Sequence, residues 1–190
     1  EISVGNNQFA FADINTFLQN FPTLKILDLS HTNLNKVPAK ISTLTNLESL
    51  NLSNNTISQN YSNLSNLINL RELNLSGNQL TKIPSELASL SALVSLDLGN
   101  NLFSSNYASV LGNLQNLEWL SLANNQITAF PAELSQLKKL VHLNFSGNKI
   151  AGGFESLLTL AELEQIYLDK NEISGAFPSS LLQLEKLQML

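Results

Sequence analysis

The side chains that could carry out acid–base or nucleophilic chemistry are few in this sequence. His142, Ser121 and Asp97 are the residue types of a hydrolytic triad, in which a histidine takes the proton of a serine and a carboxylate orients the histidine. Such a triad also needs an oxyanion hole and a sharp turn that exposes the nucleophile. The residues around Ser121 predict a flat strand instead, so we expect no catalytic residues and no enzymatic activity.

The sequence offers no complete set of metal ligands. It contains two histidines, His31 and His142, which are distant in the chain, and it has no cysteine. A zinc site needs three or four imidazole, thiolate or carboxylate ligands that converge on one point. Asp28 and Asp97 are predicted to lie three strands apart, about 14 Å at the usual spacing of strands in a sheet. We therefore expect no metal ion and no cofactor.

The composition excludes two classes of partner. The chain has 190 residues and a formal net charge of −5, whereas nucleic-acid-binding surfaces are basic because they neutralise phosphates. The sequence has no apolar run of about 18 residues, the length that a membrane-spanning helix needs. We expect neither nucleic-acid binding nor insertion into a membrane.

A pattern of eleven places must position the candidate residues. Residues 117–127 read Leu-Glu-Trp-Leu-Ser-Leu-Ala-Asn-Asn-Gln-Ile, with apolar residues at places one, four, six and eleven and Asn at place nine. Place one recurs at Leu24, Leu47, Leu70, Leu93, Leu117, Leu140, Leu163 and Leu187. Place nine is Thr32, Asn55, Asn78, Asn101, Asn125, Asn148 and Asn171. A regular period of 23 or 24 residues predicts an array of similar units that stack on one another.

This pattern, L-x-x-L-x-L-x-x-N-x-L, resembles the leucine-rich repeat family over essentially the whole chain. The resemblance implies an α/β fold, a right-handed solenoid or horseshoe. Its parallel sheet would line the concave face, and short helical, 3-10 or irregular crossovers would form the convex face. The function implied by the family is recognition of a protein partner.

The residues themselves explain why such units stack. Leu120 and Leu122 alternate with Trp119 and Ser121, which predicts a short strand with one buried face. One strand cannot bury its leucines alone, so we expect successive strands to pair in parallel, with a crossover between each pair. At place nine, we expect a ladder of amides that bond backbone groups where the chain turns inward. The ladder comprises Asn55, Asn78, Asn101, Asn125, Asn148 and Asn171.

Two kinds of crossover alternate along the chain. One kind starts with a proline, at Pro38, Pro84, Pro131 and Pro178. Because proline is tolerated at the first position of a helix, these segments predict short helical turns. The other kind lacks proline and has an aromatic residue at the matching place, which we expect to fill the core. These aromatic residues are Tyr61, Tyr107 and Phe154.

We interpret residues 1–190 as one leucine-rich-repeat domain. It has a partial repeat over residues 1–23, full repeats from residues 24, 47, 70, 93, 117, 140 and 163, and a partial repeat over residues 187–190. Residues 11–22 form the most divergent crossover and are expected to be helical, as a partial cap. Repeat arrays normally carry polar caps over their ends. Since no cap is visible after residue 184, we predict a fragment of a longer protein, or self-association through the open ends.

The residues best suited to partner binding are those that the pattern does not require. Trp119 and His142 occupy place three of neighbouring repeats, and Tyr167 occupies place five of the next repeat. Strands lie about 4.8 Å apart, so these side chains are expected to be neighbours on the outer face of the sheet. Tryptophan and tyrosine are enriched where interface energy concentrates. The expected rim is formed by Glu118, Val141 and Asp97.

We predict a module that binds a protein partner through the concave sheet. Two alternatives remain open: a structural spacer in a larger surface protein, and a carbohydrate-binding surface on which Trp119 and Tyr167 would stack against sugars. The proline crossovers are similar to those of bacterial members of the family and of some plant and intracellular members, and caps that contain cysteine are absent. These features favour a bacterial protein that is secreted or on the cell surface, with a cytoplasmic location as the alternative.

Overall fold

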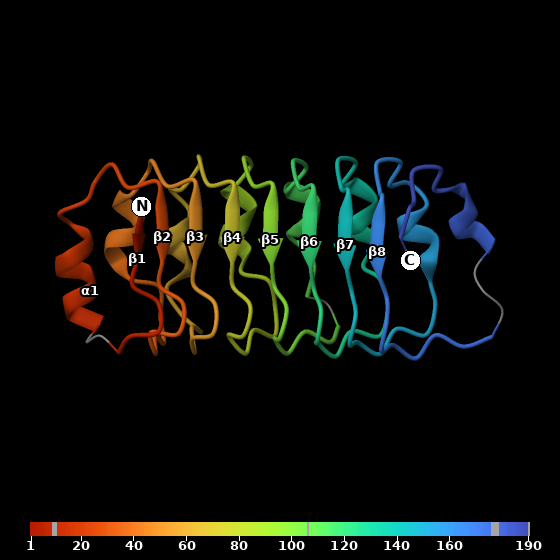
Figure 1. Cartoon of the computed structure of the whole chain (residues 1–190), viewed down its shortest axis with the longest axis horizontal. Coiled ribbons are helices and arrows are strands. Elements are labelled where there is room, and N and C mark those ends of the chain that lie inside the picture. The colour runs from red at the N-terminus through yellow and green to blue at the C-terminus, as the bar shows by residue number, and fades with distance from the viewer. Residues whose placement is uncertain (9–10, 106, 176–178, 190) are drawn as a thin grey trace.

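The chain folds as a stack of short parallel strands joined by crossovers (Figure 1). The computed structural model describes residues 1–8, 11–105, 107–175 and 179–189. Eight strands form one sheet in chain order: β1 (Ile2–Ser3), β2 (Ile26–Asp28), β3 (Ser49–Asn51), β4 (Glu72–Asn74), β5 (Ser95–Asp97), β6 (Trp119–Ser121), β7 (His142–Asn144) and β8 (Gln165–Tyr167). Each strand pairs in parallel with the next, as Leu120 does with Leu143. The predicted α/β solenoid is confirmed.

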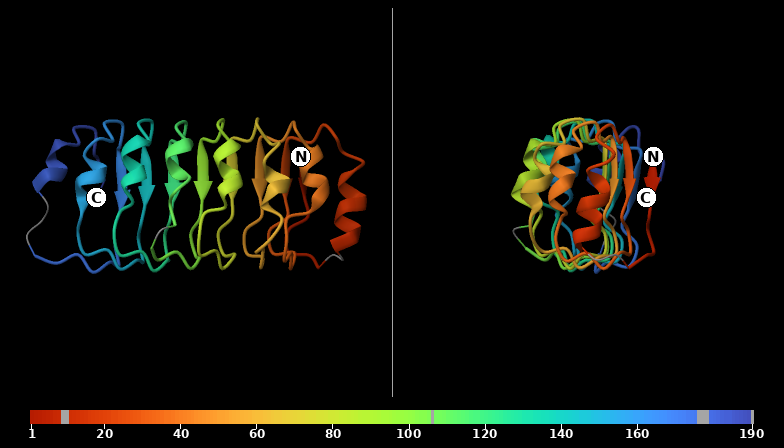
Figure 2. Two further views of the ribbon diagram at one scale, coloured as in Figure 1. Left: turned by 180° about the vertical axis from the view of Figure 1, so that it is seen from behind. Right: turned by 90° about the vertical axis from the view of Figure 1, so that its left-hand side faces the viewer.

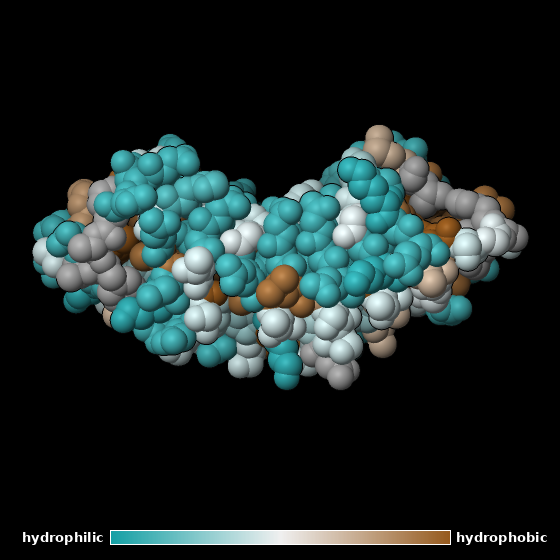
Figure 3. Space-filling model, turned by 90° about the horizontal axis from the view of Figure 1, so that it is seen from below, coloured by the Kyte–Doolittle hydropathy of each residue, from teal (hydrophilic) through white to brown (hydrophobic). Residues whose placement is uncertain are grey.

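The crossovers all lie on one side of the sheet, as the two turned views make plain (Figure 2). The first contains α1 (Phe11–Leu18), the helix expected in the divergent crossover. The others contain 3-10 turns: η1 (Ala39–Thr43), η2 (Tyr61–Leu64), η3 (Ser85–Ser89), η4 (Leu111–Asn113), η5 (Ala132–Gln136), η6 (Phe154–Leu157) and η7 (Ser179–Gln183). The molecule is bowed, with the sheet side hollowed between two raised ends (Figure 3).

Proline starts the helical turns where the sequence predicted it. Pro38, Pro84 and Pro131 directly precede η1, η3 and η5, each with a φ angle between −57° and −74°. The proline ring fixes φ near this value and needs no backbone partner, so it suits the entry to a helical turn. Pro178 lies outside the described residues, as does residue 190 of the last partial repeat.

The crossovers without proline use an aromatic side chain, and two of the three are fully part of the core. Tyr107 and Phe154 are buried, whereas Tyr61 is half-buried. Tyr61 and Phe154 each begin a 3-10 turn after a residue with positive φ, but Tyr107 does not, since η4 starts only at Leu111. The repeat that begins at Leu93 is one residue longer than the repeats that contain Tyr61 and Phe154, and the added residue separates Tyr107 from its helical turn.

The core is a continuous stack of leucines and a few aromatic rings. The leucines of places one, four and six of each central repeat are fully buried, as Leu117, Leu120 and Leu122 show. Phe130 packs against Phe145 and Phe154, with ring centroids 5.1 and 5.4 Å apart. Several exposed apolar side chains lie toward the two ends of the stack: Phe17, Phe21, Ile26, Ile173, Leu182 and Met189. Self-association through these ends stays a prediction.

The place-nine asparagines join each repeat to the one before it. The Asn101 amide nitrogen donates to the carbonyl oxygens of Leu75 and Leu98, and its Oδ1 accepts from the backbone N–H groups of Asn78 and Leu80. Bonds to carbonyls of the same and the preceding repeat recur at Asn55, Asn78, Asn125, Asn148 and Asn171. These amides satisfy backbone groups that would otherwise be buried and unpaired.

Candidate functional site

The sheet positions the candidate residues on its outer, concave face. Trp119 and His142 are paired across β6 and β7, and Tyr167 is paired with Asn144 one strand further on. Trp119, His142 and Tyr167 thus lie on three consecutive strands, with Tyr167 in the diagonal position. Their backbone positions follow from the sheet register, because each sits at an outward place of its repeat.

The three side chains differ in whether their polar groups have hydrogen-bond partners. Tyr167 is 37% exposed and its hydroxyl donates to Gln165 Oε1 at 2.9 Å. Trp119 and His142 are half-buried. Within the described residues, neither the indole N–H of Trp119 nor the imidazole of His142 has a hydrogen-bond partner. The polar groups of these two rings are therefore free to bond a partner.

The expected rim residues lie on both sides of this group. The backbone carbonyl of Glu118 accepts from the N–H groups of Val141 and His142 at 2.8 and 2.9 Å, which fixes the start of β7 against β6. The Glu118 side chain is exposed and Val141 is half-buried. Asp97 is on β5, on the opposite side of Trp119 from His142.

A shallow hollow of about 420 Å³ lies on the sheet, toward the amino-terminal side of Trp119. We call it the sheet hollow; its lining includes Ser49, Asn51, Glu72, Ser95, Asp97 and Trp119. It exists because Ser49 and Ser95 are small, while Glu72 and Trp119 rise on either side of Ser95. The sequence predicts the other aromatic members of the patch on the carboxyl-terminal side of Trp119, with only the rim residue Asp97 on the amino-terminal side. The structure adds a concavity on that amino-terminal side.

The place-five side chains have a structural role that the sequence analysis missed. Oδ1 of Asp97 accepts from the N–H of Gly99 at 2.9 Å, and so bonds the turn that follows β5. In the same way, Oδ1 accepts from the backbone N–H two residues later at Asp28, Asn51, Asn74 and Asn144. Asp97 is therefore partly committed to the fold, and only its Oδ2 is free to act at a rim. The recurrence of Asx followed two places later by Ser or Gly is the sequence signal for this turn.

Place eight also has a conformational requirement. His31 has φ of 52°, in the left-handed region, and Lys170 has φ of 56°. The other repeats have Asn or Gly at this place, the residues that tolerate positive φ best. The same place is occupied by Asn54, Gly77, Asn100, Asn124 and Gly147, all with positive φ. His31 is thus an exposed turn residue, distant from His142.

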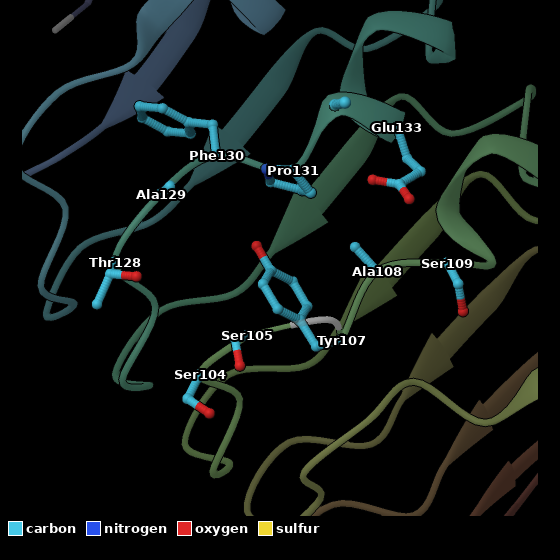
Figure 4. Close-up of a pocket in the computed structure, with 11 residues that line it drawn as sticks. Ser104, Ser105, Tyr107, Ala108, Ser109, Thr128, Ala129, Phe130, Pro131 and Glu133 are labelled. Carbon is cyan, nitrogen blue, oxygen red and sulfur yellow. The ribbon is translucent and has the colours of Figure 1, made fainter.

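A second hollow, of about 380 Å³, lies between two crossovers (Figure 4). We call it the crossover hollow; its lining includes Ser104, Tyr107, Ser109, Thr128, Pro131 and Glu133. The Tyr107 ring stands among these residues, with its hydroxyl directed toward the segment at Phe130 and Pro131 (Figure 4). That hydroxyl is buried and has no hydrogen-bond partner among the described residues. Burial, and then the charge of Glu133, raise the pKa of Tyr107 well above its ordinary value.

The equivalent tyrosine of another crossover is satisfied. The hydroxyl of Tyr61 donates to the carbonyl of Ile57 at 2.8 Å. Burial, and then the charge of Glu86, raise the pKa of Tyr61. The two tyrosines occupy the same place in their repeats, so the extra residue after Tyr107 accounts for the different surroundings.

Two kinds of feature are absent from the residues that the structure describes. In them, no three histidine, cysteine, aspartate or glutamate side chains come together as metal ligands would. None of their helices has the length and apolar character needed to cross a membrane.

Comparison with known proteins bears on the family. A sequence profile described as "Leucine rich repeat" matches residues 1–59 and 91–150, and one described as "Leucine Rich repeats (2 copies)" matches residues 68–107. No curated protein matches the sequence significantly.

Three similar solved structures come from two bacteria. A leucine-rich-repeat protein of Leptospira interrogans is 33% identical, with a TM-score of 0.88 over 99% of this chain and 47% of that one. An internalin of Listeria monocytogenes is 30% identical, with a TM-score of 0.76 over 90% of this chain and 48% of its own. Internalin C2 of the same species is 31% identical, with a TM-score of 0.77 over 93% and 73%. This chain spans about half the length of the first two proteins.

The repeated strands, the asparagine ladder and the sequence profiles all indicate leucine-rich repeats. Because the first profile covers more than half of the residues, the chain belongs to the leucine-rich repeat family.

Proposed function

We propose that the chain recognises a protein partner through its concave sheet, with Trp119 at the centre of the contact. The observation that carries the proposal is the state of Trp119 and His142, adjacent rings on the outer sheet whose polar groups have no partner in the described chain. A half-buried tryptophan beside a hollow is a favourable anchor, since such residues dominate interface energies. The similarity to internalins and the membership of a repeat family suited to binding support this function.

A carbohydrate ligand is supported less well. It would need the amide and carboxylate column at place five as hydrogen-bond partners. Five of those side chains already use Oδ1 to bond the turn that follows their own strand. The aromatic platforms, Trp119 and Tyr167, lie two strands apart, about 10 Å at the usual spacing. We therefore rank protein recognition above sugar binding, and a spacer role is the outcome if no ligand binds the sheet.

Location and origin are proposed on similarity. The three similar structures described above are bacterial, which supports a bacterial origin. We propose a secreted or surface-exposed protein, and the similarity to the two Listeria internalins supports this location. Detection of the protein on intact cells, before and after treatment with an external protease, tests this location.

Selection of displayed random peptides on the chain tests the function. Selected peptides are then measured against the wild type, Trp119→Ala and Tyr107→Phe. We expect Trp119→Ala to weaken binding by about 2 kcal/mol, roughly thirtyfold, as loss of a central anchor does. Tyr107→Phe, in the crossover hollow, is the matched aromatic control and should bind normally. Peptides that bind Trp119→Ala as tightly as the wild type would contradict the proposal.

A further inference from the structure

The sheet hollow has the lining of a cation site. Its walls are the Trp119 ring on one side and the Glu72 carboxylate on the other, with Ser95 between them. Two strand spacings, about 10 Å, separate the two walls at the backbone. Asp97 lies beside this gap, two residues after Ser95 along β5 and on the same face of the sheet. No lysine or arginine is among the described residues that line the hollow.

The carboxylates are held in place but are not neutralised. Ser49 Oγ donates to Glu72 Oε2 at 2.9 Å, and the N–H of Gly99 donates to Asp97 Oδ1 at 2.9 Å. The second oxygen of each carboxylate has no hydrogen bond to a described residue, and neither group forms an ion pair there. The nearest cation in sequence, Arg71, lines a different hollow.

The concave face as a whole favours a basic partner. Places two, three and five of the repeats contain six carboxylates but only two basic side chains. The carboxylates belong to Asp28, Glu48, Glu72, Asp97, Glu118 and Glu164, and the basic side chains to Lys25 and Arg71. One of these cations, Lys25, is already paired with Glu48 at 2.7 Å. Complementary charge steers partners and suppresses those of the wrong sign.

We propose that the sheet hollow receives an arginine side chain of a protein partner. The guanidinium group would stack on the Trp119 ring and donate hydrogen bonds to the free oxygens of Glu72 and Asp97. Arginine suits this lining because its planar group stacks on aromatic faces and its N–H groups match carboxylates. This inference rests on the proposed function, and it specifies the chemistry of the partner.

The test uses two capped peptides that differ in one side chain. One has a central arginine, and the other has citrulline, which keeps the shape but lacks the charge. Trp119 is the only tryptophan of the chain, so its fluorescence reports on the hollow directly. At low ionic strength, we expect the arginine peptide to change this signal saturably and to bind about tenfold more tightly than the citrulline peptide. Equal affinities, or no saturable change, would overturn the inference.

Charge-neutralising variants locate the effect. Glu72→Gln with Asp97→Asn should reduce the arginine preference about tenfold, while it keeps the acceptors for Ser49 and Gly99. Asp28→Asn with Glu164→Gln removes the same charge from the same face outside the hollow, and should keep most of the preference. An equal loss of the arginine preference in both double variants would show that the overall negative charge of the face causes it, and would contradict a specific site in the hollow. Denaturant unfolding of each variant confirms that its fold is retained.

The outcomes separate this inference from the proposed function. If selected peptides lack arginine yet bind in a manner that depends on Trp119, the inference is wrong and the proposed function stands. If no peptide binding depends on Trp119, both are wrong.

Discussion

The sheet hollow and the crossover hollow differ in how far their unpaired polar groups are exposed to solvent. In the sheet hollow, the free oxygens of Glu72 and Asp97 and the indole N–H of Trp119 belong to residues that line an open concavity. In the crossover hollow, the Tyr107 hydroxyl is closed off from solvent, and the residue is only 4% exposed. An exposed unpaired group is solvated at little cost, whereas a buried one forfeits its hydrogen bonds to water.

This difference in solvent exposure separates polar groups that can take part in binding from those that affect only the stability of the fold. Open groups on the sheet can gain a partner on binding, so their substitution should change affinity and leave the fold intact. The buried hydroxyl of Tyr107 cannot reach a ligand without rearrangement, so its substitution should change stability and leave binding intact. The predictions below test that division.

The largest effect is expected from the asparagine ladder, which supports both hollows. Asn101 belongs to the repeat that contains both Asp97 and Tyr107. Asn101→Ala leaves several buried backbone groups unpaired, each at a cost of about 1 kcal/mol or more, so we expect a loss of about 3 kcal/mol in the free energy of unfolding. Denaturant unfolding measures this loss. The matched control, Asn66→Ala on an exposed part of a crossover, should change stability by less than about 0.5 kcal/mol; similar losses in both variants would contradict the role of the ladder.

High pH should destabilise the crossovers. Burial raises the pKa of both Tyr61 and Tyr107, so the folded chain keeps their protons. The unfolded chain loses them from about pH 10, the ordinary value for tyrosine. The contribution of the two tyrosines to the free energy of unfolding is therefore fully present below about pH 10. It falls as the pH rises further, by up to about 1.4 kcal/mol per pH unit for Tyr107 and by less for the half-buried Tyr61. Thermal unfolding between pH 8 and 11 follows this effect, and a flat profile in that range would count against burial of the two phenols.

The two tyrosines should respond with opposite signs to loss of the hydroxyl. Tyr61→Phe removes a hydrogen bond to Ile57 and should cost about 1 kcal/mol. Tyr107→Phe removes an unsatisfied buried hydroxyl and should stabilise the chain by about 1 kcal/mol. Urea unfolding of both variants, side by side, measures the difference. A loss of stability in both would mean that the Tyr107 hydroxyl has a partner, for example an ordered water.

The smallest effect is expected at place eight, away from both hollows. His31 has a left-handed backbone, which asparagine adopts more readily. His31→Asn should raise the free energy of unfolding by a few tenths of a kcal/mol, about 0.5 at most. Lys170→Asn is a second example of the same change at the other end of the array. Destabilisation by both substitutions would show that the side chains at this place have a further role.

Most of the fold was predictable, because it depends on residues that recur. The spacing of leucines gave the strands and their register, Asn at place nine gave the ladder, and Pro38, Pro84 and Pro131 gave the helical turns. The turn bonds of place five and the left-handed residues of place eight also recur in the sequence. Sequence spacing alone does not separate these roles from that of a solvated polar residue, because Asn and Asp suit both.

The candidate site was less predictable, because it depends on residues that do not recur. The register predicted that Trp119 and His142 would be neighbours. It did not predict the hollow on the other side of Trp119, because that hollow depends on the small size of Ser49 and Ser95 and on where the Glu72 side chain is held. The lack of a hydrogen-bond partner for the Tyr107 hydroxyl likewise depends on the path of a longer crossover, and the spacing of residues does not predict that path.

The most direct test of the central claim is the NMR signal of the single indole N–H, that of Trp119, during titration with a selected peptide. If the concave sheet at Trp119 is the binding face, this signal should shift saturably, with the same dissociation constant that calorimetry gives for the peptide. A peptide that binds by calorimetry while the indole signal stays unchanged would contradict the account.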